Sequence, residues 1–283
     1  MLISALFMAV QNIIQKKILF KDHSSEYLTV FCLLMLMSLL PFSSKIQFVI
    51  DEGTILLFYL LSVLSVCAWI LIVKAHRHME ISTVEPLRNL SPFIVFILGY
   101  FILGEAITWL NGVGIFFLML GGYVLESAVE HANLLRPFSF FRGKYGQYIF
   151  FSLLLGGFCV ILTRVLVLQT NEWTTLFFLF FFASINMLLI QFFKYDGMKD
   201  IIYVLKTNGV LVVIVVAVTL LSDILFLTAL ALPAVNTTLV IAIRRLSTLF
   251  TTIVGGEIFH EKRLLIKSVA CLIMLVGVYF IVI

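Results

Sequence analysis

The sequence has 283 residues, of which 62% are hydrophobic and only 12% are charged, a balance that excludes a water-soluble globular protein and indicates a membrane protein. Its net charge of +4 comes from basic residues in short segments beside apolar runs, so we expect no nucleic-acid partner. The four cysteines lie singly in separate apolar runs without metal-ligand spacing. They are expected to be packing residues, and neither a metal site nor a cofactor is predicted.

About ten apolar runs follow one another along the chain, each near the length of roughly 17–25 residues that crosses a hydrocarbon core. They lack the alternation of barrel strands, and backbone amides inside a bilayer must be paired within their segment, so helices are predicted. The first run has no basic n-region and no cleavage site, which favours a retained helix over a signal peptide. The predicted fold is all-α and polytopic, with spans near 1–18, 27–43, 54–73, 81–103, 107–127, 147–168, 173–193, 209–231, 234–256 and 264–283.

Basic residues concentrate in alternate connectors between these runs. The even connectors, counted from the N-terminus, carry only Lys45. The odd connectors carry Lys16, Lys17, Lys21, Lys74, Arg77, Arg136, Arg142, Lys144, Lys194, Lys199, Lys206, Lys262 and Arg263. Basic connectors stay in the cytoplasm, so the pattern predicts cytoplasmic odd connectors and both termini outside.

The chain also matches itself when it is shifted by 156 positions. The motif R-N-L-S at 88–91 returns as R-R-L-S at 244–247, and further identities include Val84/Val240, Gly99/Gly255, Glu105/Glu261, Gly121/Gly277 and Tyr123/Tyr279. Each copy holds five spans, an odd number, so the second copy is predicted to enter the membrane with inverted orientation. We therefore predict two five-helix repeats, 1–127 and 147–283, joined by an interfacial linker, 128–146.

Several of these stretches resemble a known family. P-L-R-N-L-S-P at 86–92, L-G-E-A-I-T at 103–108 and L-G-G-Y at 120–123 are similar to the EamA-domain branch of the drug/metabolite transporter superfamily, as are I-R-R-L-S, H-E-K-R-L and V-G-V-Y within 243–279. The resemblance implies a ten-helix carrier with a central cavity lined by helices 1, 3, 4, 6, 8 and 9, while helices 5 and 10 pack at the periphery. The family usually keeps both termini cytoplasmic, whereas the charges of this chain favour the opposite.

Charged and polar residues inside the runs are the candidates for a substrate site. A charge near the bilayer centre costs at least ~2.5–3.5 kcal/mol on insertion scales, so it is expected to face a cavity or a partner. Arginines outnumber carboxylates there, which favours a substrate carboxylate or phosphate. The candidate substrate-binding residues are Arg88, Arg244, Glu85, Gln11, Asn12, Asp223, Arg164, Ser91 and Ser247.

A structural interpretation of the charged residues stays open. Glu85 and Arg88 are three residues apart on one helical face and would neutralise each other, and Asp223 would do the same for Arg244. Arg245 follows Arg244 by about 100° around a helix, so the two are not expected to face the same surface equally.

Other residues also have structural alternatives. Arg164 would extend toward an interface, and the amides of the first run would join helices. His76 and His78 follow the third run, and a role in titration near neutrality and plain solvation at the interface explain them equally well. Glu105 and Glu261 are expected to cap turns, and the glycines of the fifth and tenth runs to permit close helix packing.

These features together predict a secondary carrier of a small organic metabolite, anionic or zwitterionic, that works by alternating access of the two repeats. The alternative is a non-transporting scaffold or accessory subunit whose buried charges are structural pairs. An enzyme is disfavoured because no catalytic motif is present. The expected surroundings are a plasma membrane, a small-molecule substrate and the lipid bilayer, while a coupling proton and a homodimer stay open.

Overall fold

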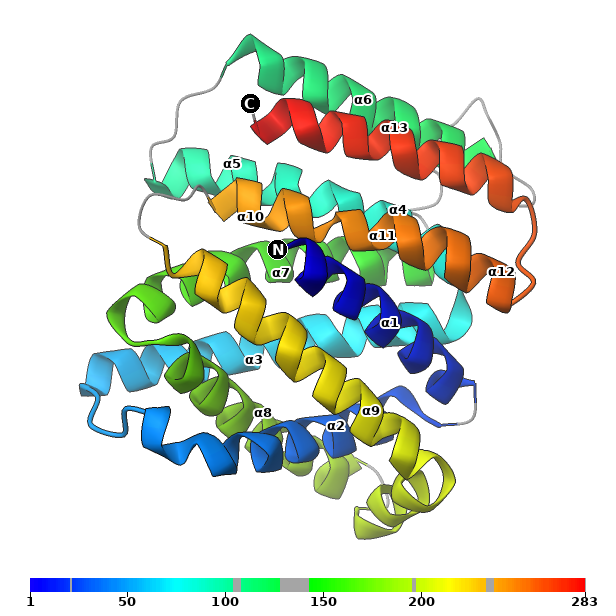
Figure 1. Ribbon diagram of the computed structural model, residues 1–283. Coiled ribbons are helices and arrows are strands. Elements are labelled where there is room, and N and C mark those ends of the chain that lie inside the picture. Colours follow the sequence, from blue (N-terminus) through cyan, green and yellow to red (C-terminus); the bar gives the residue numbers. More distant parts are fainter. Residues whose placement is uncertain (21, 104–107, 128–142, 195–196, 233–236, 283) are drawn as a thin grey trace.

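The computed structural model describes all residues except 21, 104–107, 128–142, 195–196, 233–236 and 283 (Figure 1). The residues described form helices, turns and loops and contain no strand. Nine helical segments among them are long and apolar enough to cross a membrane, and Trp109–Leu125 is a shorter apolar helix. The predicted all-α, polytopic membrane fold is confirmed, and the shorter helix occupies the place of the remaining predicted span.

The helices of the first half begin and end within a few residues of the predicted spans. They are α1 (Leu2–Leu19), α2 (Ser24–Leu39) with the 3-10 turn η1 (Leu40–Lys45), α3 (Glu52–His78), α4 (Ile81–Leu87), the 3-10 turn η2 (Arg88–Leu90), α5 (Ser91–Leu103) and α6 (Trp109–Ser127). Together α4, η2 and α5 make one interrupted span. Most of the predicted linker, and Glu105, lie outside the described residues.

The second half follows the same order. Its helices are α7 (Lys144–Gln169), α8 (Glu172–Lys194), α9 (Met198–Leu230), α10 (Thr237–Arg244), α11 (Leu246–Phe250), the π-turn η4 (Thr251–Gly255), α12 (Gly256–Ile258) and α13 (Leu264–Val282). Helix α9 begins earlier than predicted because a kink at Asn208, with φ −132° and ψ 15°, joins a short leading segment to the apolar span.

A polar cap begins the long helix α3. The Asp51 side chain accepts hydrogen bonds from the backbone N–H of Thr54 at 2.9 Å and from its hydroxyl at 2.7 Å. These bonds satisfy an N–H group that has no partner within the helix. They also hold the pKa of the exposed Asp51 carboxyl below its usual value.

The helices are arranged in layers that place the interrupted spans inside the bundle. Figure 1 shows α6 and α13 side by side at one edge, the interrupted spans next to them, and α2 and α8 at the opposite edge. Gly114 and Gly277 let the backbones of α6 and α13 touch, since a Cβ on either would lie within 2.7 Å of the carbonyl oxygen of the other. This contact confirms close packing for those two glycines.

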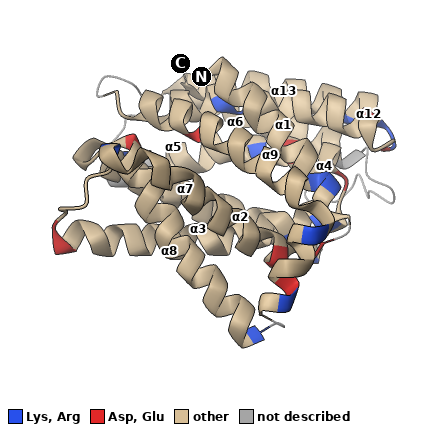
Figure 2. Ribbon diagram, turned by 60° about the horizontal axis from the view of Figure 1, so that its bottom comes forward, with Lys and Arg blue, Asp and Glu red and all other residues tan. Residues whose placement is uncertain are grey.

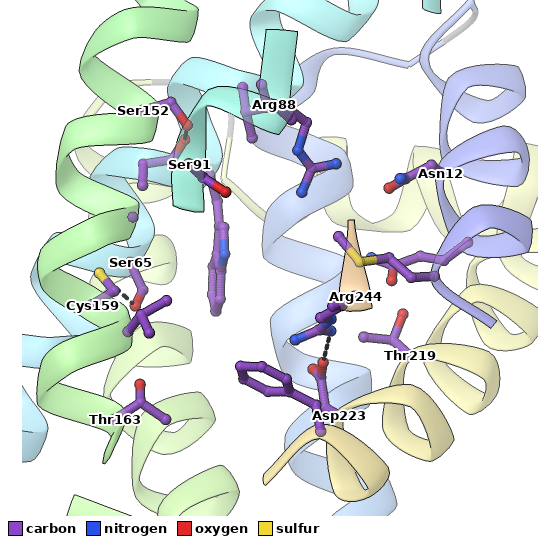
Figure 3. A pocket seen from close by; sticks show the side chains of 18 of the residues that line it. Asn12, Ser65, Arg88, Ser91, Ser152, Cys159, Thr163, Thr219, Asp223 and Arg244 are labelled. Atoms are coloured by element: carbon purple, nitrogen blue, oxygen red, sulfur yellow. Dashed lines mark hydrogen bonds and ion pairs between the residues drawn. The ribbon is translucent and has the colours of Figure 1, made fainter. Parts of the chain in front are cut away.

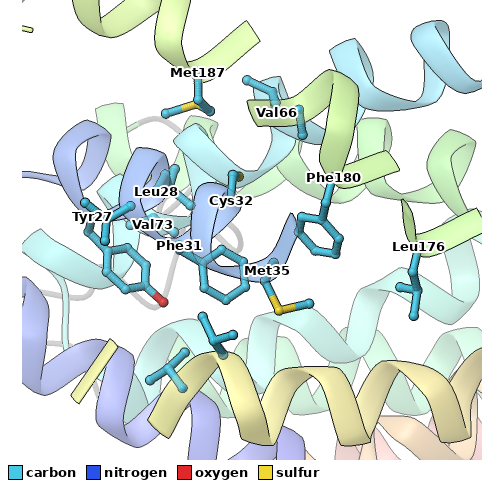
Figure 4. Packing of buried hydrophobic residues seen from close by; sticks show 14 of the residues in the cluster. Tyr27, Leu28, Phe31, Cys32, Met35, Val66, Val73, Leu176, Phe180 and Met187 are labelled. Carbon is cyan, nitrogen blue, oxygen red and sulfur yellow. The ribbon is translucent and has the colours of Figure 1, made fainter. Parts of the chain in front are cut away.

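The main apolar core lies between α2, α3, α8 and α9 (Figure 4). Phe31 packs edge-on against Phe180 with ring centroids 6.0 Å apart, and Trp69 stacks on the same ring at 5.6 Å. This core is continuous with one wall of the cavity described below, because Phe31, Trp69 and Phe180 all belong to both.

Connectors that the charge pattern assigns to the same side of the membrane meet at one end of the bundle. Phe20 contacts Phe259 with ring centroids 5.5 Å apart, and His78 stacks on Tyr145 at 4.7 Å. Figure 2 shows many of the lysines and arginines gathered at this end, near α12. These odd-numbered connectors therefore lie at the same end of the bundle, as expected if consecutive spans cross the membrane in opposite directions.

Candidate functional site

Two helix interruptions carry the repeated motif into the bundle. In the first half the α-helix stops at Leu87 and resumes at Ser91, with Arg88 in the 3-10 turn between them. Pro86 lies just before this turn and cannot donate a backbone hydrogen bond. In the second half α10 ends at Arg244 and α11 begins at Leu246, so the two breaks fall at positions related by the repeat spacing.

A cavity of about 290 Å³ lies between the two halves. Its lining comes from α1, α2, α3, the α4–α5 span, α7, α8, α9 and the α10–α11 span, and none of it from α6 or α13. The peripheral place expected for helices 5 and 10 is therefore confirmed. Helices 2 and 7, which the resemblance did not assign to the cavity, contribute apolar side chains such as Phe31 and Phe180.

The predicted site residues divide between the cavity and its surroundings. Six of them line it: Gln11, Asn12, Arg88, Ser91, Asp223 and Arg244. Figure 3 shows the arginines facing Ser91 and the serine and threonine side chains of α7 across the opening. The remaining three, Glu85, Arg164 and Ser247, are not among the lining residues.

Those three residues have other surroundings. Glu85 is completely buried behind Arg88. Arg164 donates from its guanidinium to the carbonyl oxygen of Leu232 at 3.0 Å, beyond the end of α9. Ser247 is also completely buried.

Glu85 is the centre of a polar cluster between α1, α3 and α4. Its Oε1 accepts hydrogen bonds from Arg88 Nη1 and His76 Nε2, both at 2.9 Å, and its Oε2 accepts one from Asn12 Nδ2 at 3.1 Å. Every oxygen of this buried carboxylate therefore has a partner. The pairing of Glu85 with Arg88, left open by the sequence, is observed.

His76 is not solvated at the interface, which was one of the two explanations that the sequence left open. Helix α3 continues to His78, so His76 lies inside the helix and is only 1% exposed. A fully buried imidazole needs a hydrogen-bond partner, and Glu85 provides it. Sequence reasoning missed this contact because the apolar run ends before His76, whereas the helix does not.

Arg244 is paired with Asp223 from α9. Its Nη2 donates to Asp223 Oδ1 at 2.5 Å, and the guanidinium carbon lies 4.2 Å from the centroid of the Phe226 ring. The dashed line in Figure 3 marks this ion pair at the edge of the opening. The Nε of Arg244 is buried without a hydrogen-bond partner.

Arg245 also lines the cavity, and its guanidinium has a different partner from that of Arg244, in line with the expectation that the two do not face the same surface equally. The backbone of Arg245 stays helical, and its N–H donates to the carbonyl oxygen of Ile241 at 2.9 Å. Arg245 Nε donates to the hydroxyl of Ser91 at 2.7 Å, so the two interrupted spans are joined across the halves. Its Nη1 has no hydrogen-bond partner.

The geometry defines a class of protein: a polytopic helical membrane protein with a partly open cavity between its two halves, lined by apolar side chains and by three arginines. Residues 1–126 match the model of the EamA-like transporter family. This match covers a little under half of the chain; it supports the resemblance to the drug/metabolite transporter superfamily and points to a membrane transporter. No curated protein matches the chain. A transporter family also points away from an enzyme, and the described residues hold no His, Cys, Asp and Glu group suited to a metal ion.

Proposed function

We propose that the protein is a secondary transporter that moves a small organic metabolite with an anionic group through the central cavity by alternating access. The observation that carries this proposal is the cavity itself, which is lined by interrupted spans from both halves and holds Arg88 and Arg244 at equivalent motif positions. Interrupted helices at matching repeat positions are typical of transporter substrate sites.

The packing of the helices supports an inverted repeat. Helix α3 packs against α7, and the corresponding pair in exchanged halves, α9 against α1, packs as well. Likewise α2 contacts α9, and its counterpart α8 contacts α3. Because equivalent helices make equivalent contacts, the two halves can exchange their conformations. The protein then has two states of similar energy, with the cavity open to opposite sides of the membrane.

Polar contacts between the halves at the basic end favour a closed state there. Glu261 accepts hydrogen bonds from the backbone N–H groups of Ile81 and Ser82 at 2.6 and 2.8 Å, so it caps α4 from the other half. Lys267 contacts Glu80 and donates to the Ser82 hydroxyl at 2.9 Å. Opening the cavity to this side would require these contacts to separate.

Uniport or exchange agrees with the charges better than proton coupling does. A coupling proton would bind Glu85 or Asp223, and each carboxylate already accepts a hydrogen bond from an arginine. An arginine beside a carboxylate favours its charged form and opposes protonation. The proposal includes a plasma membrane location, and it extends to a homodimer only if two copies are found to associate.

The test is uptake into proteoliposomes of a labelled panel that includes monocarboxylates, dicarboxylates, amino acids and sugar phosphates. We expect saturable uptake of at least one anionic compound, without accumulation driven by an imposed proton gradient. Liposomes without protein and liposomes with the Arg244→Gln variant are the controls, and both should show lower uptake. If folded protein moves none of the panel, the alternative of a scaffold with structural ion pairs replaces the transporter.

A further inference from the structure

The arginines that line the cavity outnumber by one the carboxylates that are paired with them. Three arginines line it: Arg88, Arg244 and Arg245. Arg88 is paired with Glu85 at 2.9 Å, and Arg244 with Asp223 at 2.5 Å. Among the residues that the structure describes, no carboxylate lies within ion-pair distance of Arg245. The uncompensated positive charge of the cavity therefore belongs to Arg245.

We propose that Arg245 is the receptor for the single carboxylate of a monoanionic substrate whose remaining part is apolar. This inference rests on the proposed transport function and names the substrate class for its cavity. Its basis is that a guanidinium without a carboxylate partner and many apolar side chains line the same cavity.

The position of the Arg245 guanidinium is fixed by one neighbour, Ser91. The bond from Nε to the Ser91 hydroxyl, at 2.7 Å, holds one edge of the planar group. Nη1 is buried and has no hydrogen-bond partner. A buried donor without an acceptor is costly, and a carboxylate is the acceptor that a guanidinium binds most strongly. Substrate binding would satisfy both the charge and the donor.

The apolar part of the lining determines the rest of the substrate. Trp69 and Phe180 stack with ring centroids 5.6 Å apart, and apolar side chains from α2, α7 and α9 continue this surface around the cavity. An apolar body placed here leaves water and gains about 25 cal/mol for each Å² that it buries. A flat or branched hydrocarbon group attached to one carboxylate fits this division of the cavity.

The same charge inventory disfavours a dianion. A second carboxylate would meet Arg88 or Arg244, and each of these is already engaged by a protein carboxylate. A negative charge without its own partner is costly in a poorly hydrated site. A dicarboxylate should therefore bind more weakly than a monocarboxylate with the same hydrocarbon group.

The test is equilibrium binding to the purified full-length protein in detergent, with 3-phenylpropionate and 4-methylpentanoate as monoanions. Their uncharged amides, phenylsuccinate and phenylalanine serve as matched ligands. We expect saturable binding of at least one monoanion and roughly tenfold weaker binding of its amide, the loss typical of a charge-assisted hydrogen bond. Equal binding of the amide or of phenylsuccinate would overturn the proposal, as would binding of phenylalanine alone.

The Arg245→Gln variant should bind the monoanion roughly tenfold or more weakly. The Arg77→Gln variant makes the same substitution at the end of α3, where Arg77 contacts His23 outside the cavity, and should bind like the wild type. If Arg245→Gln does not fold, Ser91→Ala tests the same site, because it removes the bond that orients Arg245 and should weaken binding by about threefold. Unchanged affinity in whichever of these two variants folds would assign the anion to another residue.

The result is separable from the transport assay. If the protein binds a monoanion through Arg245 but does not move it across a bilayer, the proposed role of Arg245 stands and the proposed transport function is wrong. If the wild type and Arg245→Gln transport a panel compound with the same affinity, the transport function stands and the proposed role of Arg245 is wrong.

Discussion

The Glu85 cluster illustrates how far individual residues could be predicted from the sequence. The spacing of Glu85 and Arg88 on one helical face was sufficient to suggest an ion pair, and the pair is present at 2.9 Å. The other two partners, His76 and Asn12, come from different helices. Sequence periodicity gives the contacts along one helix, whereas contacts between helices depend on crossing geometry that no local pattern encodes.

The Glu85–Arg88 pair should be coupled in stability. Glu85→Gln keeps one acceptor oxygen but leaves the buried Arg88 charge without its counterion, so we expect it to lower the free energy of unfolding by about 3–5 kcal/mol. The double variant Glu85→Gln/Arg88→Gln leaves no unpaired charge and should lose less than the sum of the two single variants. Unfolding in mixed micelles of the wild type and three variants measures the coupling. Additive losses would show that the pair is not an energetic unit.

Interrupted helices show what was predictable at the scale of secondary structure. Span positions followed from hydrophobicity, because a bilayer requires long apolar segments with internal hydrogen bonds. Pro86 indicates a break near Arg88, but Ala242 stands at the matching position of the second half, where the helix also breaks. The second break has no local sequence signal.

The contact between α6 and α13 gives a prediction with an internal control. A Cβ on Gly277 would lie 2.7 Å from the Gly114 carbonyl oxygen and 2.8 Å from the Leu118 backbone nitrogen. Gly277→Ala must therefore push two backbones apart, and we expect it to lower the free energy of unfolding by about 1–3 kcal/mol. Gly112→Ala has no atom within 4 Å of the new methyl group and should be neutral or slightly stabilising. Equal effects in a thermal unfolding assay would contradict the close packing.

At the scale of the whole molecule, the helices that line the cavity were predicted only through the family resemblance. The resemblance predicted a cavity bounded by six helices with two at the periphery, and the peripheral pair is confirmed. Helices 2 and 7 were not predicted to reach the cavity, because their apolar side chains look the same whether they face lipid, core or substrate. The capping of α4 by Glu261 from the other half was likewise visible only in the assembled bundle.

The orientation of the bundle follows from the distribution of charge between its two ends. Exposed Lys199 lies at the start of α9, at the basic end, and exposed Glu52 begins α3 at the opposite end. Because basic connectors stay in the cytoplasm, a cysteine at position 52 should react with a membrane-impermeant thiol reagent in intact cells. A cysteine at position 199 should react only after lysis. Both variants are made in a background that lacks the four native cysteines. The reverse labelling pattern would place both termini in the cytoplasm, as in most of the family, and would show that the charge bias does not set the orientation of this chain.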